Sequence, residues 1–107
     1  HELRDGEIRT YEVDPAALGL APATLDDLRG GDATTNAALA RRVLGGEPSP
    51  RADIVALNAA AGLVAAGVVD DLPAGLDAAR TSLAEGRAAA ALDALVAESQ
   101  AARAAGL

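Results

Sequence analysis

RADIVALNAAAGLVAAG, residues 51–67, is the longest apolar stretch of the chain, and we expect the rest of the fold to be organised around it. Ser49-Pro50 before it is typical of an N-cap followed by proline in the first helical turn, and Gly67 is typical of a C-terminal cap. The three- and four-residue spacing predicts a helix. Its expected inner stripe comprises Ile54, Leu57, Asn58, Ala61, Val64 and Ala65. Val55 and Leu63 lie off that stripe, so we expect burial on several sides.

The composition allows one domain with a thin core. The 107 residues include 24 Leu, Ile and Val, no Phe, and 29 Ala, so helices must approach closely over methyl groups. We therefore treat residues 1–107 as a single segment. We expect its stability to fall at or below the low end of the usual range of about 5 to 15 kcal/mol.

Charge and residue types exclude several classes of protein. The net charge of −7, with nine Arg and no Lys, argues against nucleic-acid binding and removes Schiff-base and P-loop lysines. Without Cys there is neither a disulfide nor a thiolate site, which fits a reducing compartment, and we expect the cytoplasm. His1 is the only histidine and is expected in solvent. The apolar stretch is short for a membrane span, and the charged first 13 residues do not resemble a signal peptide.

The first residues predict a β-hairpin. Residues 1–4 and 7–13 flank Asp5-Gly6, which is typical of a two-residue turn. In the second run alternate residues face opposite sides, and neither side is cleanly apolar: Ile8, Thr10 and Glu12 against Arg9, Tyr11 and Val13. Because an isolated hairpin is marginal in water, this one should lean on another part of the protein.

Two short turns and three further helices are expected. Asp14-Pro15 opens a turn that Gly19 closes, with Leu18 and Leu20 as anchors, and Thr24 can cap a second turn over residues 25–29. Helices are predicted at 33–44, capped by Asp32, at 72–85, capped by Asp70 or Asp71, and at 87–102, followed by a tail that should fray. Their expected inner faces are Asn36, Leu39, Ala40, Val43 and Leu44; Leu72, Leu76, Ala79 and Leu83; and Ala88, Leu92, Leu95, Val96 and Ser99.

Acidic residues near the second turn offer a candidate site. Gly30-Gly31-Asp32 before a helix is compatible with an anion site, but the Asp32 carboxylate would occupy that position, so a turn with an N-cap is the preferred interpretation. Asp26, Asp27 and Asp32 together could hold Mg²⁺ or act as acid and base. Solvated acids at helix starts are the simpler explanation.

Two amides lie on predicted inner faces. A buried amide without a partner costs about 1 to 3 kcal/mol, so Asn36 and Asn58 should be hydrogen-bonded to each other or to a loop carbonyl near Gly31 or Gly46. Contact with a ligand is the alternative.

Two stretches resemble a known family. GGDATTNAALARRVLGGE (residues 30–47) and RADIVALNAAAGLVAAG (51–67) are similar to the C-terminal region of anthranilate phosphoribosyltransferases. That family has Gly-Gly-Asp-Ala…Asn-Ala…Val-Leu-x-Gly, then Arg-Asp…Val…Leu-Asn-Ala-Ala. Arg51-Ala52-Asp53 is one residue looser than its Arg-Asp. Residues 2–8, Tyr11, Pro15 and Gly19-Leu20 also resemble the family's strand pair and the segment that follows it.

The resemblance implies that the chain matches about the last third of such an enzyme. The implied fold is an α/β fragment: an N-terminal β-hairpin followed by about four helices, part of the large α/β domain of a nucleoside phosphorylase/phosphoribosyltransferase-type fold. The family's Gly-Thr-Gly-Gly-Asp, Lys-His-Gly-Asn and Asp-Glu motifs have no counterpart here, and Gly30-Gly31-Asp32 is a different element. We therefore predict no catalytic, cofactor-binding or metal-binding residue in this chain.

For the parent enzyme, the resemblance implies phosphoribosyl transfer from phosphoribosyl pyrophosphate to anthranilate in tryptophan biosynthesis, with Mg²⁺, in a homodimer. The segment alone is expected to be inactive and to associate with the remainder of its enzyme or with itself. Two alternatives stay open: a free-standing helical module for protein interaction, and a small enzyme that uses Asp26, Asp27 and Asp32.

Overall fold

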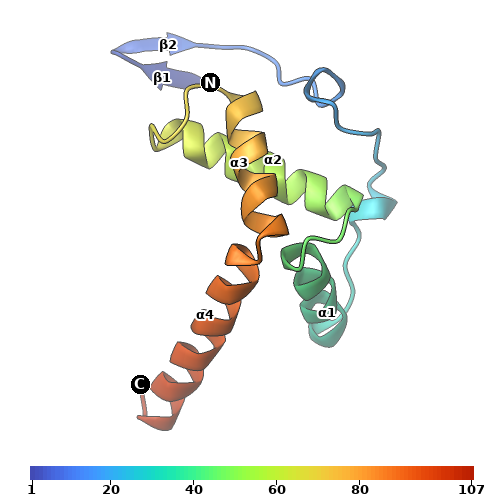
Figure 1. The fold of residues 1–107 in the computed structure, drawn as a ribbon, viewed down its shortest axis with the longest axis vertical. Coiled ribbons are helices and arrows are strands. Elements are labelled where there is room, and N and C mark those ends of the chain that lie inside the picture. The colour runs from blue at the N-terminus through green and yellow to red at the C-terminus, as the bar shows by residue number, and fades with distance from the viewer.

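The computed structural model describes residues 1–107 and has a hairpin, two single-turn 3-10 helices and four α-helices (Figure 1). The order of elements confirms the prediction, and each α-helix begins and ends within two residues of its expected bounds. The elements are β1 (Glu2–Arg4), β2 (Glu7–Arg9), η1 (Ala16–Leu18), η2 (Asp26–Leu28), α1 (Ala33–Leu44), α2 (Pro50–Ala65), α3 (Leu72–Ala84) and α4 (Arg87–Ala104).

Capping side chains explain why the helix starts were predictable. Asp32, Ser49 and Asp71 each accept a hydrogen bond from the backbone N–H three residues later, at 2.8, 3.0 and 2.9 Å. Each satisfies a donor that the first helical turn would leave unpaired. η1 is closed by Gly19 and anchored by buried Leu20, as expected.

The core lies where α2 crosses α3. Ala52, Ala56 and Ala60 are the buried residues of α2. A Cβ added to Gly75 of α3 would lie 2.9 Å from both the Cα and the carbonyl oxygen of Ala60, so the two backbones touch without side chains between them. Leu76, Ala79 and Leu83 complete the buried face of α3, which confirms the stripe predicted there.

The inner stripe predicted for α2 is wrong for this chain. Ile54 is 41% exposed, Asn58, Ala61 and Ala65 are exposed, and Leu57 and Val64 are only half-buried. The alanine face packs on α3 because small side chains permit the close approach at Gly75. No α-helix covers the bulkier stripe, although Leu57 packs against the core, and full burial of α2 on several sides is likewise not observed.

α1 packs by one edge only. Val43 is buried, while Leu39 and Leu44 are half-buried. Asn36 and Ala40, predicted on the same inner face, are exposed because no helix lies over the first turns of α1.

α4 projects away from the other helices (Figure 1). It has no buried residue; Ala88, Leu92 and Val96 of its predicted inner face are half-buried, whereas Ser99 is exposed and Leu95 is 65% exposed. An ion pair of 3.1 Å between Arg41 and Asp93 links it to α1. α4 continues to Ala104, two residues beyond its expected end, and Leu107 N–H donates to the Ala102 carbonyl at 2.9 Å.

Very little of the chain is enclosed. Only nine of 107 residues are buried, and the radius of gyration is 16.2 Å, against about 13 Å for a compact domain of 100 residues. The fold is therefore a well-capped set of helices around one small core, with much of its apolar surface uncovered.

Candidate functional site

The hairpin presents two different faces. Asp5 and Gly6 both have left-handed backbone angles, with φ of 52° and 80°, as a two-residue hairpin turn requires. Leu3 pairs with Ile8 on one face, and both are more than 70% exposed. The regular part of β2 ends at Arg9, so the paired strands show one apolar face, Leu3 and Ile8, although the whole run of residues 7–13 has mixed faces as expected.

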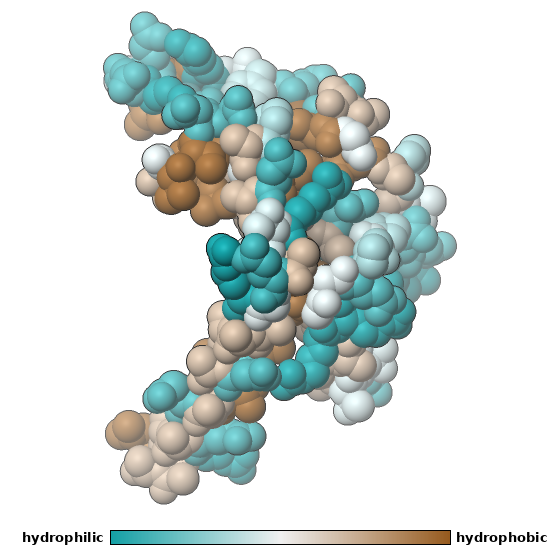
Figure 2. All heavy atoms as spheres, in the orientation of Figure 1, coloured by the Kyte–Doolittle hydropathy of each residue, from teal (hydrophilic) through white to brown (hydrophobic).

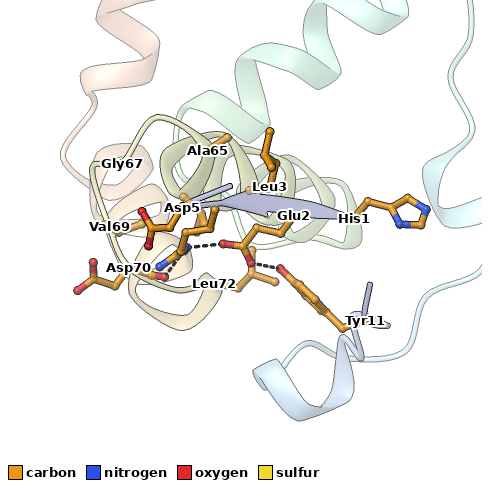
Figure 3. Close-up of a pocket in the computed structure, with 13 residues that line it drawn as sticks. His1, Glu2, Leu3, Asp5, Tyr11, Ala65, Gly67, Val69, Asp70 and Leu72 are labelled. Carbon is orange, nitrogen blue, oxygen red and sulfur yellow. Dashed lines mark hydrogen bonds and ion pairs between the residues drawn. The ribbon is translucent and has the colours of Figure 1, made fainter. Parts of the chain in front are cut away.

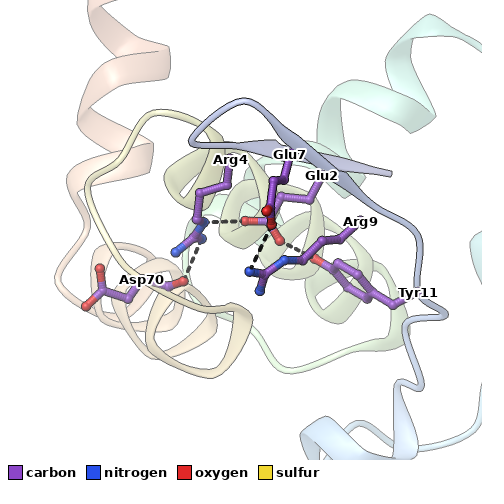
Figure 4. Close-up of polar contacts among 6 residues, drawn as sticks. All are labelled: Glu2, Arg4, Glu7, Arg9, Tyr11 and Asp70. Carbon is purple, nitrogen blue, oxygen red and sulfur yellow. Dashed lines mark hydrogen bonds and ion pairs between the residues drawn. The ribbon is translucent and has the colours of Figure 1, made fainter.

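The charged face of the hairpin holds it against the loop between α2 and α3. The Glu2 carboxylate accepts from Arg4 Nε at 2.7 Å and from the Tyr11 hydroxyl at 3.3 Å (Figure 4). Arg4 Nη2 then donates to the Asp70 carbonyl at 2.9 Å. The hairpin thus leans on another part of the protein, as predicted. This network binds two segments together, and it leaves the Glu2 carboxylate engaged by two donors.

Sequence reasoning missed the charged face of the hairpin, although a signal for that face was present. Once Asp5-Gly6 fixes a two-residue turn, Glu2 lies opposite Arg9 and Arg4 opposite Glu7. Opposite charges paired across one face of a hairpin indicate a polar contact surface.

A hollow of about 720 Å³ lies between the hairpin and the C-terminal half of α2 (Figure 3). Ala61, Val64 and Ala65 form its helical wall, and Leu3 and Tyr11 belong to the other side. In Figure 2, apolar surface gathers below the hairpin at this end of α2.

A second hollow, of about 390 Å³, lies along the N-terminal half of α2. Ile54 and Leu57 line it together with Pro15, Leu20 and Leu28. The two hollows therefore follow the same stripe of α2. The wall of the second is mostly apolar, whereas charged side chains of the hairpin and Asp70 form much of the wall of the first.

Gly30-Gly31-Asp32 forms a turn and an N-cap. The Thr35 backbone N–H, and secondarily the Thr35 hydroxyl, lower the pKa of the Asp32 carboxyl below its usual value. Asn36 Oδ1 accepts from the Gly31 N–H at 2.8 Å, and its Nδ2 donates to the Gly31 carbonyl at 2.9 Å. The predicted amide contact near Gly31 is confirmed, and the carboxylate occupies the position that an anion would need.

The acids near η2 have separate partners. Asp26 pairs with Arg29 at 2.7 Å. Asp27 Oδ2 accepts from the Thr24 N–H at 2.8 Å, and the Asp27 N–H donates to the Thr24 hydroxyl at 3.3 Å, so Thr24 caps this turn as predicted. Chiefly the Thr24 N–H lowers the pKa of Asp27. No three His, Cys, Asp or Glu side chains are grouped so that they could hold a metal ion.

Asn58 differs from its prediction. It is exposed, and its Nδ2 donates to the Ile54 carbonyl of the same helix at 2.8 Å, rather than to Asn36 or to a loop. Its Oδ1 accepts no hydrogen bond within this chain.

A sequence model described as "Glycosyl transferase family, a/b domain" matches residues 1–89. The chain belongs to this family. Among its relatives are two proteins named anthranilate phosphoribosyltransferase, from Rhizobium johnstonii and Rhizobium rhizogenes, with 47% and 52% identity over 97 residues. Each alignment covers 91% of this chain but only 29% of the relative. The predicted family resemblance is therefore confirmed.

A solved structure of the same family confirms the fold class. The anthranilate phosphoribosyltransferase of Thermus thermophilus is 48% identical and superimposes with a TM-score of 0.77 over 81% of this chain and 27% of that protein. A hairpin and four helices as part of an α/β domain is thus the fold of this segment. None of its helices combines the length and the apolar character that crossing a membrane requires.

Proposed function

We propose that this chain is the C-terminal structural part of an enzyme that transfers phosphoribosyl from phosphoribosyl pyrophosphate to anthranilate, in tryptophan biosynthesis. The observation that carries the proposal is the identity of about half of all aligned residues with proteins of that name, combined with coverage of 29% of their length. The chain accounts for one portion of such an enzyme, and the proposed activity belongs to the whole.

The reaction places demands that this chain does not meet. Displacement at an anomeric carbon needs an oriented nucleophile and groups that stabilise the departing pyrophosphate, such as Mg²⁺ and backbone donors. Here Asp27 accepts a hydrogen bond from the Thr24 N–H, Asp32 caps α1, Asp26 pairs with Arg29, and there is no Lys. These residues do not fit a Mg²⁺ site, so we assign no catalytic, cofactor-binding or metal-binding residue to the chain. Mg²⁺ and both substrates would be bound by the rest of the enzyme.

The role assigned to this chain is structural. Parallel sheets need helices on their faces, and α1 to α4 would cover one face of the enzyme's sheet while the hairpin extends its edge. Residues 1–107 then form one part of the larger α/β domain. The parent enzyme would be a cytoplasmic homodimer.

A chimeric enzyme tests this function. The segment of the Thermus enzyme that aligns with this chain is replaced by residues 1–107, and consumption of anthranilate is followed by its fluorescence with phosphoribosyl pyrophosphate and Mg²⁺ present. The chimera should be active, and the Thermus protein without its segment should not. A folded but inactive chimera would contradict the proposal.

The isolated chain provides the complementary measurement. It should neither catalyse the transfer nor bind phosphoribosyl pyrophosphate in calorimetry with Mg²⁺, because it lacks Lys and a loop that cradles phosphate. Turnover by the 107 residues alone, or a sub-millimolar dissociation constant, would place the site in this chain after all.

The exposed apolar side chains support a second candidate, a free-standing module for protein interaction. Sedimentation separates the two candidates. The transferase proposal predicts that the chain alone self-associates or is only partly ordered at micromolar concentration, whereas a compact, cooperatively melting monomer would favour the module.

A further inference from the structure

α3 and α4 meet at a glycine. Gly86 has a left-handed φ of 76°, and a Cβ added there would meet no atom within 4 Å. Glycine populates positive and negative φ about equally, so its backbone can turn at little cost. The direction of α4 relative to α3 therefore depends on a residue that can adopt more than one conformation.

Beyond this joint, one ion pair holds α4 beside α1. Both helices extend away from the crossing of α2 and α3 (Figure 1), and α4 has no buried residue. Arg41 Nη1 donates to Asp93 Oδ1 at 3.1 Å, and no other ion pair joins α4 to α1 or α2. The two side chains are 57% and 67% exposed. Such an exposed pair shifts an equilibrium by up to about fivefold, and salt weakens it.

An apolar hollow of about 530 Å³ lies near the base of the angle between α1 and α4. Leu44 of α1 and Ala88 of α4 line it, together with Val55 and Leu63 of α2. Because its walls come from α1 and α4 as well as α2, the direction of α4 affects how far this apolar surface is open to solvent.

We propose that α4 is a hinged arm that turns about Gly86, with the ion pair of Arg41 and Asp93 as a salt-sensitive tether. At low salt the tether holds α4 beside α1. When salt screens the pair, α4 turns away and the hollow of about 530 Å³ opens. This device belongs to the four helices of the chain and does not depend on the proposed function.

Distances between spin labels, measured by double electron–electron resonance, test the motion. The chain has no cysteine, so labels attach only at introduced cysteines. Ala38→Cys on α1 and Ala101→Cys near the end of α4 report on the arm, and both positions are exposed. Ala38→Cys with Asp77→Cys on α3 gives a reference distance that does not cross the joint. Labelled chain is diluted in excess unlabelled chain, so that only distances within one molecule are measured.

The wild-type chain should give one narrow distribution of the α1–α4 distance at about 20 mM salt and a longer component at about 500 mM. Arg41→Gln should raise the population of the longer component by up to about fivefold at low salt. The matched control is Arg42→Gln, since this neighbouring arginine pairs with Glu47 instead, and it should behave like wild type. Exchange of the two charges, Arg41→Asp with Asp93→Arg, should restore the narrow distribution.

Gly86→Ala tests the joint itself. Alanine disfavours a positive φ by more than an exposed ion pair contributes, so α4 should turn away even at low salt. The proposal is overturned by a wild-type distribution that does not change with salt, by an unchanged distribution in Arg41→Gln or Gly86→Ala, or by opening in Arg42→Gln as well. A reference distance between α1 and α3 that changes together with the arm would also overturn it, because the motion would then lie in the core.

Discussion

α3 and α4 are consecutive alanine-rich helices, yet only α3 has an interior face. α3 buries Gly75, Leu76, Ala79 and Leu83 against its neighbours, whereas α4 buries nothing. Both sequences show apolar residues at helical spacing. The difference arises because α2 crosses α3, while α4 extends beyond it (Figure 1). Helical period therefore identifies the residues that can be buried, and the presence of a partner in the same chain decides whether they are.

The substitution with the largest expected effect on this difference between α3 and α4 is Leu76→Ala. Leu76 is 3% exposed at the centre of the core, so its truncation should cost about 2 to 5 kcal/mol and unfold a chain of low stability. Leu95→Ala on α4 is the control and should change stability by less than about 0.5 kcal/mol. Urea midpoints provide the measurement, and similar shifts for both variants would show that α3 and α4 are equally buried.

Gly75→Ala tests the close contact of α2 and α3. Its new methyl group would meet Ala60 backbone atoms at 2.9 Å, so the helices must separate, at a cost of about 1 to 3 kcal/mol. Gly62→Ala is the matched control on α2, where nothing lies within 4 Å of the added Cβ. Since alanine favours helix, the control should stabilise by up to about 1 kcal/mol. Opposite signs in thermal melts are expected; stabilisation by both would mean that the helices do not touch.

Ile54→Ala tests the side of α2 that lies opposite its buried alanines. The helical pattern alone predicts a loss of about 2 to 5 kcal/mol for Ile54 or Leu57, as for core residues. Because Ile54 is 41% exposed, the loss in the isolated chain should instead stay near or below about 1 kcal/mol. In the chimera with the Thermus enzyme the same change should cost more. A large loss in the isolated chain would mean that another element covers this face.

The smallest expected effect concerns pH. The pKa of Asp32 is lowered on folding by the Thr35 N–H, so its stabilising effect is present above the unfolded value of about 3.9 and is lost as pH falls through the lower folded value. Asp32→Asn keeps a capping oxygen and does not titrate. Below about pH 4 the variant should lose less stability than the wild type, measured as urea midpoints at matched pH. Parallel pH profiles would show that this cap does not contribute.

Local chemistry made most elements predictable from the sequence. Asp5-Gly6 determined the hairpin turn, and Asp32, Ser49 and Asp71 determined three helix starts, because each acts through bonds within a few residues. The packing was less predictable. The spacing in α2 predicts that its bulkier stripe faces the core, but the alanine face is buried instead because Gly75 permits a closer approach.

In the candidate site, too, the local contacts were predictable from the sequence and the long-range ones were not. The contacts of Asn36 with Gly31 and of Thr24 with Asp27 are local, and both were expected. The link from Arg4 to Asp70 spans 66 residues and depends on how the hairpin is placed, so no spacing in the sequence predicts it. The spacing predicts that Asn58 is buried, but it is exposed because the alanine face of α2, and not the face that carries Asn58, packs on α3.

Hydrogen exchange of the isolated chain, resolved by residue, tests most directly that these 107 residues are an ordered but incomplete part of a larger protein. Exchange reports local opening, which is slowest where the core is densest. The account predicts the strongest protection in α2 and α3 around Ala60 and Leu76, with rapid exchange in α4 and residues 1–31. Adding the Thermus enzyme that lacks its aligned segment should then slow the exchange of residues 54–65 and of residues 1–31. Uniform protection of all four helices in the chain alone would contradict the account.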